Sequence, residues 1–214
     1  PITSVWVMLP PLQIPRQRCA AAAAQGCLNV VGGDMPHATL AACERFDPIA
    51  GAWEAVPPMT MARTGCAAAS LWDRLYVAGG ADAVGHASSS AEMLDPSVGR
   101  WLQLPSMASA REFCAAAALH GKLYVLGGRI SLWGTLSSVE CYDPVSGCWS
   151  SCADMPEERA RCGVAAAAGQ LYVFGGSDSR YEALERACRF DPAVGRWQPL
   201  PEGSTARVSC AVAA

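Results

Sequence analysis

One motif recurs four times along this chain at a nearly constant interval, and this interval constrains the possible folds more than any other feature. Each copy contains a glycine pair and closes on the segment Asp-Pro-x-x-Gly-x-Trp. The closing tryptophans are 48 residues apart, and the glycine pairs step by 47, 48 and 48 residues. The tryptophans are Trp53, Trp101, Trp149 and Trp197, and the pairs begin at Gly32, Gly79, Gly127 and Gly175. The chain is therefore built from one repeated supersecondary unit.

An arginine and a cysteine keep the same interval. The arginine stands 16 residues before the first glycine of each pair, and a cysteine follows it three residues later. A fifth copy of both lies near the end of the chain. The arginines are Arg16, Arg63, Arg111, Arg159 and Arg207, and the cysteines are Cys19, Cys66, Cys114, Cys162 and Cys210. So many positions in register exclude a chance match.

Each repeat predicts four β-strands, named A to D in chain order. In the second repeat they are a small apolar run at 66–71, an aromatic and β-branched run at 75–78, and two alternating runs at 90–94 and 101–104. The Asp-Pro-x-x-Gly segment is a tight turn, because proline presets φ and glycine accepts a positive φ. It predicts that C and D form a hairpin. The A runs are mostly alanine, which suits an innermost strand where blades converge.

These repeats resemble the kelch-repeat family over essentially the whole chain. The glycine pair, the tyrosine before it at Tyr76, Tyr124 and Tyr172, and the later tryptophan all match the family pattern. Asn29 stands in place of the tyrosine in the first repeat, and Cys188 replaces the glutamate found at Glu44, Glu92 and Glu140. The resemblance implies an all-β fold, a kelch-type β-propeller.

The repeat boundaries predict four complete four-stranded blades and two partial repeats. The complete repeats span about 16–62, 63–110, 111–158 and 159–206. We expect residues 1–15 to supply an N-terminal D strand and residues 207–214 a C-terminal A strand. Such a chain makes an open arc, part of a propeller that the resemblance implies is six-bladed, and its blade edges invite self-association. Because the sequence starts at Pro1 rather than Met, we expect a piece of a longer protein.

Composition narrows the classes of partner. The formal net charge is −3 and 51% of the residues are hydrophobic, so the chain can bury a large core and offers no basic footprint for nucleic acid. No apolar run approaches the ~20 residues needed to cross a bilayer, so no membrane partner is expected. The 11 cysteines are an odd number, five of them at one strand position, and are interpreted as reduced core residues rather than metal ligands. Reduced thiols favour an intracellular, cytoplasmic location.

Enzyme motifs for phosphate binding, serine hydrolysis and zinc catalysis are absent, so the chain is predicted to be non-catalytic, with no catalytic residues, cofactor or metal site. His37, His86 and His120 do not align in the repeats. The alternative function is a kelch-like enzyme or carbohydrate-binding propeller, which would need a polar cluster on the axis.

Strand directions place the B–C and D–A connections on one face of the disc, where loops on a rigid scaffold concentrate binding residues. We predict that this face binds a protein or peptide. The resemblance implies that the recurring arginine and the residue after the glycine pair contact this partner. It also implies that the chain is the substrate-recognition part of a ubiquitin-ligase adaptor or of a scaffold. The candidates are Arg16, Arg63, Arg111, Arg159, Arg207, Asp34, Arg129, Trp133, Ser177, Arg180 and Tyr181.

Two alternatives stay open for the arginines. An identical residue in every repeat can serve the framework, or it can bind carboxylates or phosphates of an acidic partner through its guanidinium fork. Trp133 lies outside the repeat pattern, and we predict that it is exposed and anchors the partner, whereas Trp149 is predicted to belong to the core.

Overall fold

Four antiparallel sheets of four strands each form the protein, and each sheet is one repeat. The computed structural model describes residues 6–130, 134–201 and 205–212. In every sheet the strands follow the order A, B, C, D. Blade 1 contains β1 (Ala20–Ala24), β2 (Cys27–Val31), β5 (Cys43–Asp47) and β6 (Ala52–Val56), and blade 2 contains β7 (Ala67–Leu71), β8 (Arg74–Ala78), β9 (Ala91–Asp95) and β10 (Arg100–Leu104). Blade 3 contains β11 (Ala115–Leu119), β12 (Lys122–Leu126), β13 (Val139–Asp143) and β14 (Cys148–Ser151), and blade 4 contains β15 (Gly163–Ala167), β16 (Gln170–Phe174), β17 (Cys188–Asp191) and β18 (Arg196–Pro199). The predicted kelch-type β-propeller fold is confirmed.

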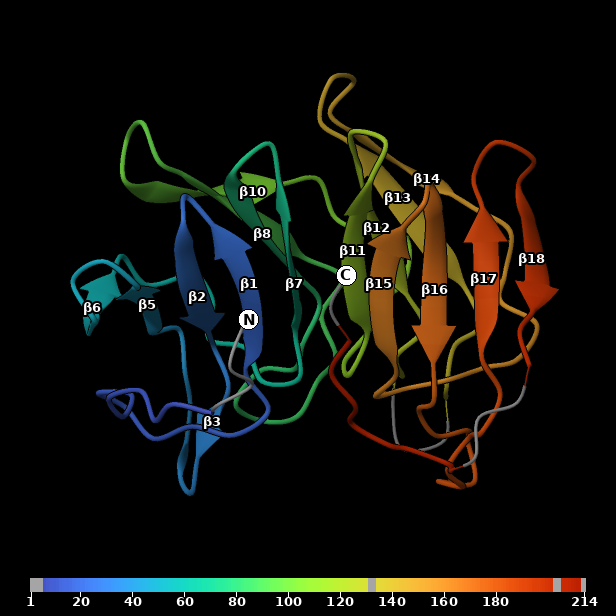
Figure 1. The fold of residues 1–214 in the computed structure, drawn as a ribbon, viewed down its shortest axis with the longest axis horizontal. Helices are drawn as coiled ribbons and strands as arrows, with labels where there is room; N and C mark the ends of the chain where they lie inside the picture. The colour runs from blue at the N-terminus through green and yellow to red at the C-terminus, as the bar shows by residue number, and fades with distance from the viewer. Residues whose placement is uncertain (1–5, 131–133, 202–204, 213–214) are drawn as a thin grey trace.

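The alanine-rich A strands are innermost. Strand β1 packs on β7, β7 on β11 and β11 on β15, while the D strands lie outside (Figure 1). Alanine has a high helix propensity, but here it forms strands because the narrow inner side of each blade has room only for small side chains. Strands β1 and β15 are not packed on each other in this way, so the blades form an open arc. Leu28 and Phe174, at its two ends, stay 39% and 37% exposed.

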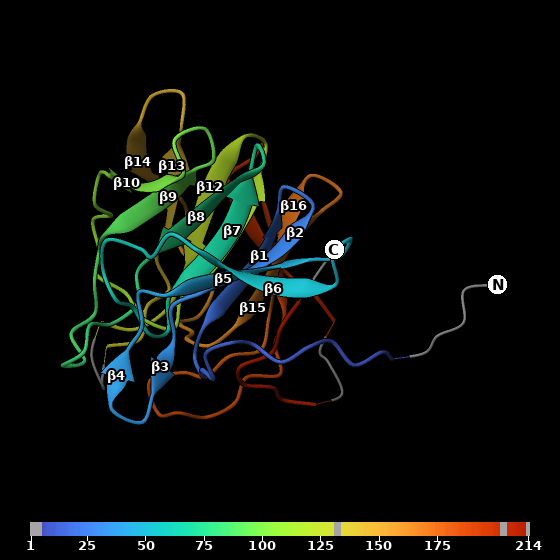
Figure 2. The same cartoon turned by 90° about the vertical axis from the view of Figure 1, so that its left-hand side faces the viewer.

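A small hairpin decorates blade 1. Strands β3 (Asp34–Met35) and β4 (Ala38–Thr39) pair within the B–C connection, below the blades (Figure 2). All four B–C connections carry an isolated β-bridge to the D–A segment, such as Thr64 with Ala81. The B–C and D–A connections therefore share one face.

The predicted flanking strands are not formed in the described residues, so that part of the sequence prediction is wrong. Residues 6–15 contain no strand, because a D strand hydrogen-bonds to the C strand of its own blade and the described residues offer none. Residues 207–212 reach the place expected of an A strand. The Gly176 N–H donates to the Arg207 carbonyl at 2.8 Å, as the Gly80 N–H does to Arg111. They form no ladder because no B strand lies beside them.

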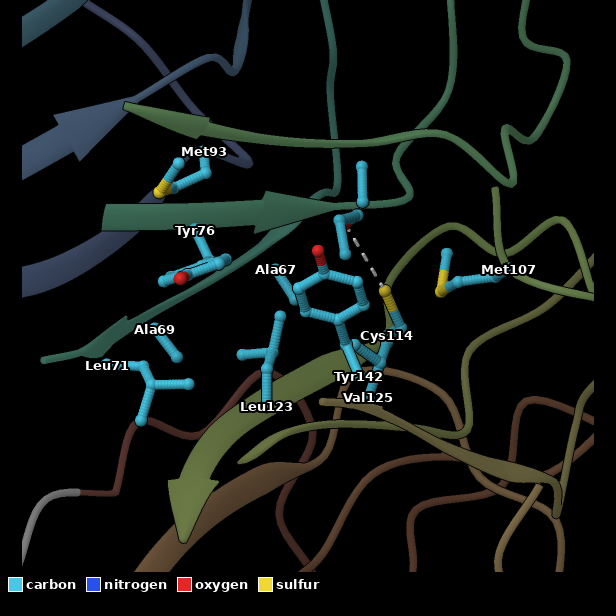
Figure 3. Packing of buried hydrophobic residues seen from close by; sticks show 12 residues of the cluster. Ala67, Ala69, Leu71, Tyr76, Met93, Met107, Cys114, Leu123, Val125 and Tyr142 are labelled. Atoms are coloured by element: carbon cyan, nitrogen blue, oxygen red, sulfur yellow. Dashed lines mark hydrogen bonds between the residues drawn. The ribbon is translucent and has the colours of Figure 1, made fainter. Parts of the chain in front are cut away.

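Apolar clusters hold neighbouring blades together. Between blades 2 and 3, Tyr76, Leu123 and Tyr142 pack with the A-strand alanines (Figure 3). The tyrosine rings lie 6.4 Å apart between centroids. Trp149 packs on this cluster but is only partly buried, which corrects its prediction as a core residue. It lies at the outer strand, and its indole N–H donates to the carbonyl of Pro105 at 2.7 Å.

The same bond joins every pair of successive blades. The indoles of Trp101 and Trp197 each donate at 2.8 Å to a backbone carbonyl that follows the D strand of the preceding blade, and Trp53 donates at 2.8 Å to the Pro10 carbonyl of the N-terminal segment. The recurring tryptophan thus fixes each blade to its neighbour by both packing and a hydrogen bond.

Candidate functional site

The recurring arginines form a buried framework. Arg111 is fully buried, and its Nη1 donates to the carbonyls of Gly127 at 2.8 Å and Ser138 at 3.1 Å. Its Nη2 lies 2.7 Å from Oε1 of Glu140. The Glu140 carboxylate also accepts the backbone N–H groups of Ala108 and Ser109. One arginine and one glutamate thereby join the glycine pair, the B–C loop and the D–A segment.

The same network occurs around Arg16 with Glu44 and around Arg63 with Glu92. Its packing explains the glycine pair: a Cβ at Gly32, where φ is +62°, would lie 2.5 Å from the carbonyl oxygen of Arg63. The side chains of Arg16, Arg63, Arg111 and Arg159 are at most 1% exposed. Of the two alternatives, burial favours the framework role for these four, and contact with a partner stays a prediction.

Blade 4 departs from the pattern at two linked positions. Cys188 stands where the other blades have glutamate, and Pro156 stands where Ala108 donates its N–H to that glutamate. Proline has no N–H, so a glutamate at 188 would lose one of its donors. Arg159 pairs instead with Glu157 at 2.8 Å. Arg207, the fifth member, is exposed and lines a hollow of about 260 Å³ beside Phe174.

A hollow of about 560 Å³ opens on the face of the B–C and D–A connections. Blades 2 and 3 supply most of its walls, including Glu112, Phe113 and Arg129, and Arg18 and Arg161 reach it from blades 1 and 4. Because four repeats contribute, the hollow lies where the inner ends of the blades meet.

A chain of hydrogen bonds between blades forms the inner edge of this hollow. It runs through the residue two positions after each recurring arginine. From the second of these residues onward, each N–H donates to the equivalent carbonyl one repeat earlier, and the four bonds measure 2.6–2.9 Å. All five residues have a positive φ, between +53° and +61°. Such a backbone is costly for residues other than glycine, and here the blade-to-blade bonds hold it. The five are Arg18, Gly65, Phe113, Arg161 and Ser209.

Aromatic rings and guanidinium groups gather at this site. The Arg161 guanidinium lies 4.4 Å from the centroid of the Phe113 ring, and that of Arg129 lies 4.8 Å from it. Arg129 Nη1 donates to the Tyr181 hydroxyl at 3.2 Å. Stacking of this kind holds a guanidinium in a fixed position while its edge stays free to donate.

The charges in the hollow are unevenly balanced. Arg129 Nε lies 2.8 Å from Glu112, whereas Arg18 is 3.7 Å from Asp34 with a half-exposed side chain. Within the described residues Arg161 forms no ion pair. Burial lowers the pKa of Arg161, and the charges of Arg129 and Arg18 lower it further. The hollow is therefore a site of positive potential that an anionic group would relieve.

The other predicted residues are divided between this hollow and its surroundings. Arg129 lines it, and Tyr181 lies beside it in contact with Arg129, as described. Asp34 lies in an adjacent hollow of about 450 Å³ and accepts a hydrogen bond from the Thr64 hydroxyl at 2.7 Å. Ser177 is only 4% exposed and Arg180 is exposed on its loop. Trp133 lies outside the described residues.

Arg18, Glu112, Phe113 and Arg161 were missed by the sequence reasoning. For Arg18, Phe113 and Arg161 the sequence does offer a signal, which is one position that varies between two residues that are the same in every repeat. Between an invariant arginine and an invariant cysteine, the second residue is Arg18, Gly65, Phe113, Arg161 or Ser209. The backbone of this position links the blades, whereas its side chain changes from blade to blade and is free to serve a partner.

The recurring cysteines line the axis below this site, in a hollow of about 360 Å³. Burial raises the pKa of Cys66 and Cys162 to about 12 and that of Cys114 to about 11, so these thiols stay protonated. Cys19 and Cys148 are exposed, which corrects the prediction that all cysteines are core.

Across the described residues, no three histidine, cysteine or acidic side chains are placed to hold a metal ion. Nor does that part of the chain contain a helix able to cross a bilayer.

Comparison with known proteins agrees with the architecture. Residues 20–212 match the family model described as the KLHDC2/KLHL20/DRC7 Kelch-repeats domain. Among solved structures, one titled "Structure of YjhT" superposes with a TM-score of 0.81 at 16% sequence identity, over 94% of this chain and 69% of that one. At this identity the likeness shows the fold alone. No curated protein matches the chain.

Proposed function

The chain belongs to the kelch-repeat family, whose propellers are generally protein-interaction modules, and we propose that this one binds an acidic peptide segment of a protein partner in the axial hollow. The observation that carries the proposal is Arg161: a guanidinium without an ion pair in the described residues, stacked 4.4 Å from Phe113 and facing the same hollow as Arg18 and Arg129.

The chemistry of the hollow favours a carboxylate. A stacked guanidinium offers its donors as a planar fork, which matches a carboxylate through two parallel hydrogen bonds. Phe113 and Tyr181 provide apolar and aromatic surface beside the charge, the combination that most often anchors interfaces. A volume of about 560 Å³ holds a few side chains, so a short segment fits better than a whole folded domain.

A wider role follows from the same proposal. A propeller that recognises an acidic segment can act as the substrate-recognition part of an adaptor, including a ubiquitin-ligase adaptor, or of a scaffold. Co-purification of ligase subunits with the full-length protein tests that wider role separately from peptide binding.

The direct test is a peptide screen read by fluorescence anisotropy. We expect binders to be enriched in Asp and Glu, and replacement of the critical carboxylate by its amide should weaken binding about tenfold or more, the loss of about 1.5–3 kcal/mol for a charged hydrogen bond. Arg161→Ala should weaken binding to a similar extent. Arg100→Ala removes the same charge from an exposed position at the start of β10, beside the C–D turn of the opposite face, so it should leave affinity unchanged.

Two results would contradict the proposal. Binders without acidic residues, bound equally by Arg161→Ala, would move the partner away from the hollow. Equal weakening by Arg100→Ala would show that net charge, and not this site, controls binding.

A further inference from the structure

A hollow of about 310 Å³ on blade 4 lies at the place where the other blades hold their framework carboxylate. Cys188 takes in β17 the register that Glu140 takes in β13, opposite a valine of the B strand. A cysteine side chain ends at its sulfur, well short of the position that a glutamate carboxylate reaches. The walls of the hollow include Cys188 with Pro156, Glu157 and Arg159, each one repeat after a residue of the carboxylate site in blade 3.

Arg159 has an unused donor beside this hollow. Its side chain is 1% exposed, its Nη1 donates to two backbone carbonyls, and its Nη2 lies 2.8 Å from Oε1 of Glu157. Its Nε has no hydrogen-bond partner within the described residues. In blade 2, by contrast, Nε and Nη2 of Arg63 both donate to Glu92, at 3.2 and 2.7 Å. The guanidinium edge that holds the glutamate in blade 2 is therefore only half used in blade 4.

The chemistry of the hollow favours a carboxylate, because the Nε–Nη2 edge of a guanidinium matches two carboxylate oxygens. Burial raises the pKa of the Cys188 thiol to about 11, so the residue that replaces the glutamate stays neutral and does not repel an anion. Pro156, Arg186 and Pro199 line the hollow and are exposed, so it opens to solvent. A free carboxylate can keep part of its hydration at this opening, whereas a glutamate at 188 would start from a position that is 3% exposed.

We propose that this hollow binds a small carboxylate anion, whose oxygens accept from Nε and Nη2 of Arg159 when Glu157 turns out to solvent. Glu157 can leave because 27% of its side chain is already exposed. The Nε of Arg111 also lacks a partner, but there the Glu140 carboxylate already lies 2.7 Å from Nη2 and takes the place of the anion. In the described part of the chain, this hollow and the axial one share no lining residue, so the two sites are separate.

The test is thermal unfolding of the protein in sodium acetate, compared with sodium chloride at the same concentration and pH. The melting temperature should rise and level off in acetate alone, because the anion binds only the folded chain. A ligand of this size binds weakly, so we expect half of the rise at about 1–10 mM acetate.

A second ligand distinguishes the two sources of a carboxylate. N-acetylglutamate N-methylamide carries its single charge on a glutamate side chain, as a protein partner would. If it reaches half of its effect at a lower concentration than acetate, the site takes a side chain of a partner. If it needs a higher concentration, the site takes a free small carboxylate. A saturable rise with neither ligand would overturn the proposal.

Matched variants locate the effect on blade 4. Cys188→Met fills the place of the missing side chain without adding charge, so it should abolish the rise in acetate. Glu157→Gln removes the competing carboxylate and should lower the half-saturating concentration about two- to fivefold, as expected for a partly exposed ion pair. Glu182→Gln removes the same charge from an exposed position on the B–C connection and should change nothing.

Three results contradict the site as described. They are an equal rise in acetate and chloride, an acetate effect that survives Cys188→Met, and a half-saturating concentration that Glu157→Gln leaves unchanged. If Cys188→Met fails to fold, the comparison of Glu157→Gln with Glu182→Gln decides the matter, because both changes lie at positions that are at least partly exposed.

Discussion

Replacement of Arg111 by alanine tests the buried arginine framework most directly. The change leaves the carbonyls of Gly127 and Ser138 without their Nη1 donor and removes the cation 2.7 Å from Glu140, whose side chain is 5% exposed. Removal of one partner of a buried ion pair costs about 3–5 kcal/mol, because the other charge stays buried without compensation. At about 2–4 °C per kcal/mol for a chain of this size, the melting temperature should fall by roughly 6–20 °C.

Arg159→Ala provides the internal comparison. Its acidic partner, Glu157, is 27% exposed, so water can solvate that carboxylate after the arginine is removed. The remaining loss is the donor to the buried carbonyl of Gly175 and to the partly buried carbonyl of Arg186, which both accept from Arg159 at 3.0 Å. The expected cost is about 1–3 kcal/mol. Arg100→Ala, at the exposed start of β10, should cost less than about 0.5 kcal/mol.

The assay is calorimetric or fluorescence-detected unfolding of the three variants beside the wild type. The expected order of destabilisation is Arg111→Ala, then Arg159→Ala, then Arg100→Ala. A melting temperature of the Arg111→Ala protein equal to that of the Arg100→Ala protein would refute the framework role. A larger loss for Arg159→Ala than for Arg111→Ala would refute the argument from burial of the paired carboxylate.

Three more outcomes follow from single contacts. Trp101→Phe keeps most of the ring but loses the indole bond to the Pro57 carbonyl at 2.8 Å, so the free energy of unfolding should fall by about 1 kcal/mol or somewhat more in a denaturant titration. Cys188→Glu should destabilise although it restores the repeat pattern, because Pro156 supplies no N–H to the new carboxylate, and the Pro156→Ala change should recover part of the loss in the same titration. Hydrogen bonding with Cys152 and with the Ser150 hydroxyl lowers the pKa of the Cys141 thiol to about 6. Alkylation of Cys141, followed by mass spectrometry, should therefore slow as the pH falls through about 6, because protonation removes the thiolate, whereas an ordinary thiol slows near its own pKa of about 8.5. A midpoint for Cys141 near the ordinary value would contradict this hydrogen bonding.

The sequence alone predicted the repeating unit and much of its interior. The interval between tryptophans defined the blades, the Asp-Pro-x-x-Gly turns defined the C–D hairpins, and the alanine runs placed the A strands innermost. These features are local to one repeat, so periodicity and turn chemistry are enough to recognise them. The face shared by the B–C and D–A connections also followed, because it depends only on strand direction.

Other properties needed the tertiary structure. Burial of Arg111 depends on three segments closing around it, and a recurring arginine in sequence fits a binding role equally well. The flanking segments at 6–15 and 207–212 match the repeat in sequence but form no strand, because a strand needs the backbone of a neighbour.

The candidate site shows most clearly what only the tertiary structure decides. Arg18, Phe113 and Arg161 come from three repeats and meet at the axis only because the blades pack in an arc. Sequence periodicity describes each blade by itself, whereas convergence of side chains depends on the angle and register at which blades and strands pack. The sequence therefore determined the fold and the face that the B–C and D–A connections share, and the tertiary structure decided which residues of that face lie together.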